Sequence, residues 1–424
     1  MNVVCLVFCG VVLAFCRMLG GEGPNEAIVW VLIAIFSVFY LSSLWKTPES
    51  RDVASALCGG YCLRLFFVMV DIYLRNYFLL PNSGADTEMF YYGAIRVMQG
   101  GESHRGFFVY VMAAVFQLFG VSRLWGQFLI MLCSMAALHF AYRSLVECKV
   151  QPQISSKVMT ILCLLPNSAL LSSLFLREAL IYMFLSISMY CFILWMTRSS
   201  EKCYLLAFAF AFGAMRFHSG TVAVPIGYFI ARFLYNSEKH TFSFSAKNII
   251  ISVMFLAIAG FVAARFEDAV LGKMSSVESL EDIANVNTMG GSNYSQYVGN
   301  SSSPVHFVLF TPLRIFFFLF SPLPIFWRGL ADVIAFCFSS CFYLLVICKA
   351  LKFLRNYPYH DLRRCIVMGL LIVAACAAFV FGWGVSNAGT ACRHREKMAI
   401  FYAVIWALSL QSKEHVNNTE FVAV

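Results

Sequence analysis

Long apolar runs recur along the whole chain and determine its predicted architecture. They include residues 27–45, 158–174, 179–196, 249–264 and 366–382. Each run is close to the ~20 residues that a helix needs to cross about 30 Å of hydrocarbon. Because short polar turns alternate with these runs, no room is left for a soluble domain. The pattern predicts an all-α, polytopic membrane protein in which residues 1–424 form a single transmembrane domain.

The composition agrees with a membrane as the solvent. Of the 424 residues, 60% are hydrophobic and 12% are charged, which would leave a soluble domain with more apolar surface than it could bury. The first run, residues 3–19, has neither a basic start nor a small-residue cleavage site, so we expect a retained helix. The 16 cysteines lie mostly inside apolar runs without metal-ligand spacing. We interpret them as small buried hydrophobes and predict no metal site.

Basic clusters between the runs predict the orientation of the helices. They lie at residues 143–157, 198–202, 232–247 and 349–364. Clusters of this kind mark the cytoplasmic side, so the net charge of +9 orients the helices and does not indicate binding of nucleic acid. Keeping the clusters on one side requires that the runs at 106–121 and 306–324 are not full crossings, and prolines interrupt the second run. We expect two outer-face juxtamembrane or re-entrant helices and about 12 spanning helices.

Two long segments then face outward, one over residues 81–124 with a juxtamembrane helix and one over residues 266–324 with a Pro-interrupted amphipathic helix. The cations predicted on this face are Arg96, Arg105, Arg123, Arg177, Arg216, Arg265, Arg314, Arg328, Arg393 and Arg395, with Lys273 and Lys397. Orientation alone predicts few cations of either kind here. The excess of arginine indicates bidentate recognition of phosphate or carboxylate. The alternative is that arginines reach ordinary lipid headgroups.

The first candidate constellation lies in the outer segment at residues 83–92. Asp86 and Glu88 stand beside Tyr91 and Tyr92. Carboxylates accept hydrogen bonds or a proton from sugar hydroxyls, and aromatic rings pack on the apolar face of a sugar. The alternative for Asp86 is a structural helix N-cap.

Two further constellations lie at the ends of apolar runs. Arg177 and Glu178 are adjacent and are expected either to bind an anion or to pair with neighbouring charges. Arg216 and His218 lie in the tight connection at residues 215–220, between two apolar segments. Ionisable residues at a membrane boundary are costly and usually functional.

The fourth constellation precedes the last apolar run. Arg393, His394 and Arg395 place two guanidinium groups around an imidazole that can titrate near neutrality, which suits a diphosphate leaving group. The backbone amides of Gly389 and Thr390 are expected to assist.

A separate group of charges occupies one early helix. Arg64, Asp71 and Arg75 share that helix, and the spacing of four residues between Asp71 and Arg75 predicts an ion pair. We expect these residues to tie the helix into the bundle. The alternative is that these residues contribute to a substrate groove.

Several motifs occur in an order that resembles the Wzy-type polymerases of bacterial O antigen, capsule and exopolysaccharide, within the membrane glycosyltransferases of the type C fold. The motifs, in chain order, are Gly84-Ala85-Asp86 with Tyr91; Leu118-Phe119-Gly120; Pro166 ahead of Arg177-Glu178; Arg216-Phe217-His218; Phe320-Ser321-Pro322-Leu323-Pro324; and Gly389-Thr390-Ala391 leading into Arg393-His394-Arg395. The resemblance covers most of the chain and lies in the order of these features.

The resemblance implies a reaction and its partners. Oligosaccharide repeat units carried on undecaprenyl diphosphate would be joined at the outer face of the bacterial cytoplasmic (inner) membrane, without metal, nucleotide sugar or other cofactor. Membrane lipid would surround the protein, and a chain-length regulator protein is a further candidate partner. The sequence contains no nucleotide-binding glycine motif.

The resemblance also suggests roles for the candidate residues. Arg216, Arg393 and Arg395 would hold the diphosphate, and Asp86 or His218 would deprotonate the acceptor hydroxyl. Further substrate contacts are expected from Glu88, Tyr91, Tyr92, Arg177, Glu178 and His394. Two alternatives remain open: a type C glycosyltransferase that uses a polyprenyl-phosphate sugar donor, and a transporter of lipid-linked glycans.

Overall fold

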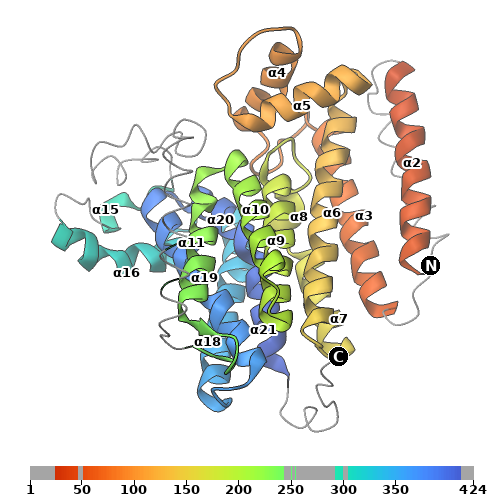
Figure 1. Ribbon diagram of the computed structural model, residues 1–424. Coiled ribbons are helices and arrows are strands. Elements are labelled where there is room, and N and C mark those ends of the chain that lie inside the picture. The colour runs from red at the N-terminus through yellow and green to blue at the C-terminus, as the bar shows by residue number, and fades with distance from the viewer. Residues whose placement is uncertain are drawn as a thin grey trace.

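The computed structural model describes residues 24–45, 51–242, 250, 254, 292–298 and 304–411. Its first long helices are α2 (Pro24–Leu44), α3 (Arg51–Tyr73), α6 (Arg123–Glu147) and α9 (Glu178–Arg198). They stand side by side, with α6 packed against both α3 and α9 (Figure 1). Helix makes up 81% of the structure and strand 2%, which confirms the predicted all-α class.

Within the part of the chain that the structure describes, six stretches of helix are long and apolar enough to cross a membrane. They are Glu26–Leu44, Arg51–Tyr73, Arg123–Glu147, Glu178–Arg198, Leu330–Asn356 and Leu362–Gly384. The chain is therefore a membrane-spanning protein, but the described residues do not confirm the predicted count of about 12 crossings. The predicted helix at residues 3–19 lies outside the described residues, and only two residues of the run at 249–264 are described.

The other helices complete the bundle and its ends. They are α4 (Ala85–Met98), α5 (Phe107–Phe119), α7 (Pro152–Leu164), α8 (Pro166–Leu171), α10 (Glu201–Phe217), η2 (Ser219–Val222), α11 (Ala223–Leu234), α15 (Ser295–Val298), α16 (Pro304–Phe320), η4 (Pro324–Phe326), α17 (Leu330–Ala335), η5 (Phe336–Ser340), α18 (Cys341–Asn356), α19 (Leu362–Gly384), α20 (Ala388–Arg395), η6 (Glu396–Met398) and α21 (Ala399–Leu410). The two strands, β1 (Tyr235–Asn236) and β2 (Thr241–Phe242), form one short antiparallel pair.

Two apolar helices run across the direction of the long ones. They are α5, with 13 residues, and α16, with 17 residues and Pro312 in its interior (Figure 1). Both are shorter than the ~20 residues of a full crossing, as expected of the runs at 106–121 and 306–324. The side of the membrane on which they lie stays a prediction.

The apolar run at 158–174 is not one continuous helix. It breaks at Leu165 between α7 and α8, because Pro166 has no N–H to donate and its ring disfavours the helical conformation of the preceding residue. Arg64 of α3 lies at this break, with its Nη1 donating to the Cys163 carbonyl at 2.7 Å. Its Nε donates to the hydroxyl of Ser134 at 2.8 Å. Arg64 therefore joins α3 to α6 and α7, as predicted.

Replacing Arg64 with leucine is expected to lower the free energy of unfolding by about 2 kcal/mol, because the acceptors at the break lose a charged donor. The Nη2 atom of Arg64 has no hydrogen-bond partner among the described residues, so removing the side chain also removes a small cost. Thermal unfolding in detergent measures the change. Arg51→Leu, at the exposed start of the same helix, is the matched control and should leave the melting temperature unchanged.

Candidate functional site

Arg393 of α20 joins three of the four constellations. Its Nη1 donates to Asp86 Oδ2 at 2.6 Å, and its Nε donates to Glu178 Oε1 at 2.6 Å. Asp86 belongs to α4 and Glu178 to α9, so three distant segments meet at one guanidinium. The site lies at the end of the bundle that carries α4 and α5 (Figure 1), and we refer to it as the Arg393 site.

The two carboxylates of the Arg393 site differ in exposure. The Asp86 side chain is 50% exposed, whereas that of Glu178 is 6% exposed. Glu178 is the first residue of α9, where the positive end of the helix dipole favours a negative charge. The inner carboxylate therefore holds Arg393 in place, and the outer one can exchange with an anion from outside the protein.

Arg177 adds a second guanidinium to this region. It lies at the N-cap of α9, and its guanidinium carbon is 5.7 Å from the centre of the Phe90 ring in α4. The preceding residues 172–176 are buried although they lie outside the helices. Non-helical backbone at membrane depth is tolerated only where protein or a water-filled cavity surrounds it, so this buried segment can set the position of Arg177 and Glu178.

Two histidines face each other next to Arg393. The ring centres of His218, at the end of α10, and His394, in α20, lie 4.5 Å apart. The His218 Nδ1 accepts the backbone N–H of Gly220 at 3.1 Å. The Nδ1 of His394 lies 2.8 Å from Lys397 Nζ. His218, from the connection at residues 215–220, therefore lies in the same site as His394 and Arg393.

Burial controls the charge of these imidazoles. It lowers the pKa of His218 and of His394 well below the ordinary value, and the positive charges of Lys397, Arg177 and Arg393 lower both further. Both rings are therefore neutral near pH 7. Neutral imidazole carries one proton, and the hydrogen bond of one ring nitrogen decides which nitrogen holds it.

A cavity of about 20 Å³ borders Arg393 and is large enough for about one water molecule. Its lining is Ser168, Leu171, Ser172, Glu178, Ala179, Tyr182, Arg393, Glu396 and Lys397. Burial raises the pKa of Glu396 and so favours its neutral form. Arg177 and Arg393 balance the carboxylates of Asp86 and Glu178, so an anion that displaced Asp86 would meet the Arg393 guanidinium.

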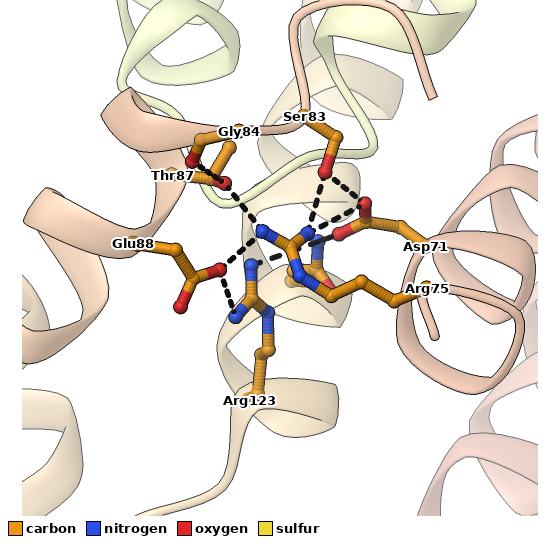
Figure 2. Close-up of polar contacts among 8 residues, drawn as sticks. Asp71, Arg75, Ser83, Gly84, Thr87, Glu88 and Arg123 are labelled. Atoms are coloured by element: carbon orange, nitrogen blue, oxygen red, sulfur yellow. Dashed lines mark hydrogen bonds and ion pairs between the residues drawn. The ribbon is translucent and has the colours of Figure 1, made fainter. Parts of the chain in front are cut away.

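Glu88 takes part in a second polar network, the α4 anchor, formed by Asp71, Arg75, Ser83, Thr87, Glu88, Arg123 and Gln127. Arg75 donates to Asp71 at 3.1 Å, which confirms the predicted pair, and it also donates to Glu88. Arg123 of α6 donates to the same Glu88 oxygen at 2.7 Å. Figure 2 shows Glu88 between these two guanidinium groups. Both arginines and both carboxylates are committed here, so the network fixes α4 on α3 and α6.

The prediction that Arg395 helps Arg393 to hold a diphosphate is wrong. Residues two apart on a helix do not face each other, and Arg395 is 1% exposed on the other side of α20. Its Nη1 donates to the carbonyls of Phe318, Leu319 and Ser321 at 3.2, 2.6 and 2.9 Å. The last carbonyls of a helix lack partners within it, so Arg395 caps α16 and is not free to bind substrate.

The backbone amides of Gly389 and Thr390 are also committed elsewhere. Both donate to the side-chain oxygen of Asn387, at 2.9 and 3.3 Å. Asn387 is the N-cap of α20, a position that favours asparagine for this reason. The expectation that these amides assist a diphosphate is therefore not supported by their geometry.

The remaining candidates border the Arg393 site. The Tyr91 ring packs against Phe175, with ring centres 5.4 Å apart, and Tyr92 is exposed beside it. Arg216 is exposed, and its guanidinium carbon lies 5.2 Å from the centre of the Phe107 ring in α5. These positions leave Tyr92 and Arg216 accessible to a ligand, and their predicted roles stay predictions.

Sequence reasoning counted Lys397 as one outer cation and gave it no role. The structure buries it within the Arg393 site. The signal was its spacing, since Lys397 follows Arg393 by four residues and His394 by three, and residues so spaced share a helix face.

The fold and the site define an all-helical membrane-spanning protein with a cation-rich polar site at one end of its bundle. Over the described ranges, no group of three or more histidine, cysteine, aspartate or glutamate side chains is arranged to hold a metal ion. No protein-family model, curated protein or solved structure matches the chain.

Proposed function

We propose that this protein is a glycosyltransferase that joins lipid-diphosphate-linked oligosaccharide repeat units into a surface polysaccharide. The substrates would be undecaprenyl-diphosphate-linked glycans, and the Arg393 site would face the exterior of a bacterial cytoplasmic membrane. The resemblance in the order of motifs motivates the proposal. The geometry supports it through one observation: four of the six motifs in the resemblance supply Asp86, Glu178, His218 and Arg393 to connected parts of one site.

The first step of the proposed reaction is binding of the diphosphate. Planar guanidinium groups bind phosphate oxygens through paired hydrogen bonds, and Arg393 is placed to do so once Asp86 leaves its Nη1. Arg177 adds positive charge nearby. This charge would stabilise the diphosphate as the bond from the anomeric carbon to the phosphate oxygen breaks.

The second step is attack by the acceptor hydroxyl on that anomeric carbon. A new carbon–oxygen bond forms, the lipid diphosphate leaves, and the hydroxyl proton moves to a base. His218 is poorly suited to be this base, because its Nδ1 already accepts the Gly220 amide and its single proton must then lie on Nε2. Asp86, once displaced from Arg393, and His394 are the remaining candidates.

Deleting the gene tests the proposed function, because a polymerase, a single-sugar transferase and a transporter leave different glycans. Loss of a polymerase should leave one complete repeat unit on the surface lipid, seen as a single band in place of a ladder on a gel. A truncated unit would instead indicate a transferase that uses a polyprenyl-phosphate donor. Complete units that accumulate on the lipid carrier and do not reach the surface would indicate a transporter.

A further inference from the structure

Lys397 is the buried lysine of the Arg393 site, and it has no role in the two steps described above. It is 2% exposed, and its Nζ lies 2.8 Å from the Nδ1 of His394, within hydrogen-bonding distance. It also lines the cavity that borders Arg393, together with Glu178. The contact ties the protonation state of Lys397 to the tautomer of His394, because one of the two nitrogens must donate to the other.

The contact between Lys397 and His394 has two chemically distinct forms. If Lys397 is an ammonium, it donates to Nδ1, and the single imidazole proton of His394 must lie on Nε2. If Lys397 is a neutral amine, its lone pair can accept a hydrogen bond from Nδ1–H, and Nε2 then carries a free lone pair. His394 can act as a base at Nε2 only in the second form.

The surroundings of this pair favour the neutral amine. Arg177 and Arg393 oppose a further positive charge, while Glu178 is the carboxylate that favours it. Burial lowers the pKa of Lys397 well below its ordinary value; Glu178 opposes this shift, and Arg177 and Arg393 add to it. The other titratable groups at the pair are the neutral ring of His218, Tyr182 and Glu396, whose pKa is raised by burial.

We propose that Lys397 is a positioning residue that acts through His394: it keeps the imidazole proton on Nδ1, so that Nε2 can accept the proton of the acceptor hydroxyl. This inference rests on the proposed function for the identity of the hydroxyl. As the oxygen attacks, its proton moves to Nε2 and the proton on Nδ1 moves to the Lys397 amine. Lys397 ends as an ammonium next to Glu178 and the departing diphosphate, and later returns the proton to water.

The rival role for Lys397 is that of a plain cation for anion binding, and two substitutions separate the roles. Arginine keeps the positive charge but cannot become neutral, so Lys397→Arg should lock the proton of His394 on Nε2 and reduce glycan polymer by at least about 100-fold. Glutamine is neutral, and its carbonyl can accept a hydrogen bond from Nδ1–H although it cannot take the proton itself, so Lys397→Gln should retain more polymer than Lys397→Arg. If Lys397 acts only as a cation, Lys397→Arg should instead make more polymer than Lys397→Gln.

The tautomer of His394 can be measured without any substrate. In full-length protein labelled with ¹⁵N-histidine, nitrogen NMR distinguishes protonated from bare ring nitrogens, and His394→Gln identifies the signals of His394. As pH rises through the pKa of Lys397, the proton of His394 should move from Nε2 to Nδ1. The midpoint should lie below the ordinary lysine value of about 10.4.

The outcomes separate this inference from the proposed function. A proton on Nε2 up to pH 10 in the wild-type protein, or full activity of Lys397→Arg, overturns the inference. If the Lys397→Arg protein is absent from the membrane, the wild-type titration still decides. A deletion strain that keeps its ladder overturns the proposed function, whatever tautomer His394 adopts.

Discussion

Cells that carry Arg393→Ala in place of the wild-type gene are expected to make at least about 100-fold less glycan polymer, because the variant loses the fork that would stabilise the departing diphosphate. The protein should stay folded, since Arg177 remains to compensate the buried Glu178 carboxylate. Gel analysis of the surface glycan, alongside immunoblots of the membrane fraction, measures both quantities.

Two matched variants sharpen this prediction. Arg393→Lys keeps the charge without the planar fork, so its activity should lie between those of wild type and Arg393→Ala. Arg328→Ala removes an arginine whose partner is Asp332, four residues along the chain, in a half-exposed ion pair. Such pairs contribute little, so its polymer should be unchanged. Normal chain lengths from Arg393→Ala would remove Arg393 from the mechanism.

The second large effect is expected two residues away and is of a different kind. Arg395→Ala should lower the free energy of unfolding by at least about 3 kcal/mol, because the carbonyls at the end of α16 lose a buried charged donor. Less protein should reach the membrane, and what remains should unfold at a lower temperature in detergent.

Arg393→Ala and Arg395→Ala serve as controls for each other, because they should affect polymer yield and stability differently. Arg393→Ala should reduce polymer at nearly normal stability, whereas Arg395→Ala should reduce stability first. If purified Arg395→Ala melts with the wild type, the capping role is wrong and the guanidinium has another purpose. If both variants lose the same stability, Arg393 is needed for folding as well as for activity.

Local patterns predicted the parts of this protein that depend on neighbours in the sequence. The helices over 27–45, 179–196 and 366–382 follow from continuous apolar runs, and the Asp71–Arg75 pair follows from a spacing of four. The break at Pro166 was also encoded locally. It was missed because the apolar run on either side of the proline gave the stronger signal.

The composition of the site could be predicted in part, but its geometry could not. Four short polar motifs stood out against an apolar background, and residues from all of them meet around Arg393. Which side chain turns toward the site depends on helix phase: Arg393 and Arg395 look equivalent as letters but lie on different faces of α20. The pairing of Asp86 with Arg393, 307 residues apart, leaves no periodic trace in the sequence.

That separation also orders the biogenesis of the protein. The α4 anchor draws on residues 71 to 127 and can assemble while most of the chain is still on the ribosome, which positions Asp86 early. Arg393 emerges only after a further 307 residues have followed Asp86. A nascent chain halted before α20 would thus carry a settled α4 without the Arg393 partner of Asp86, and the Arg393 site would be completed only when α20 is in place.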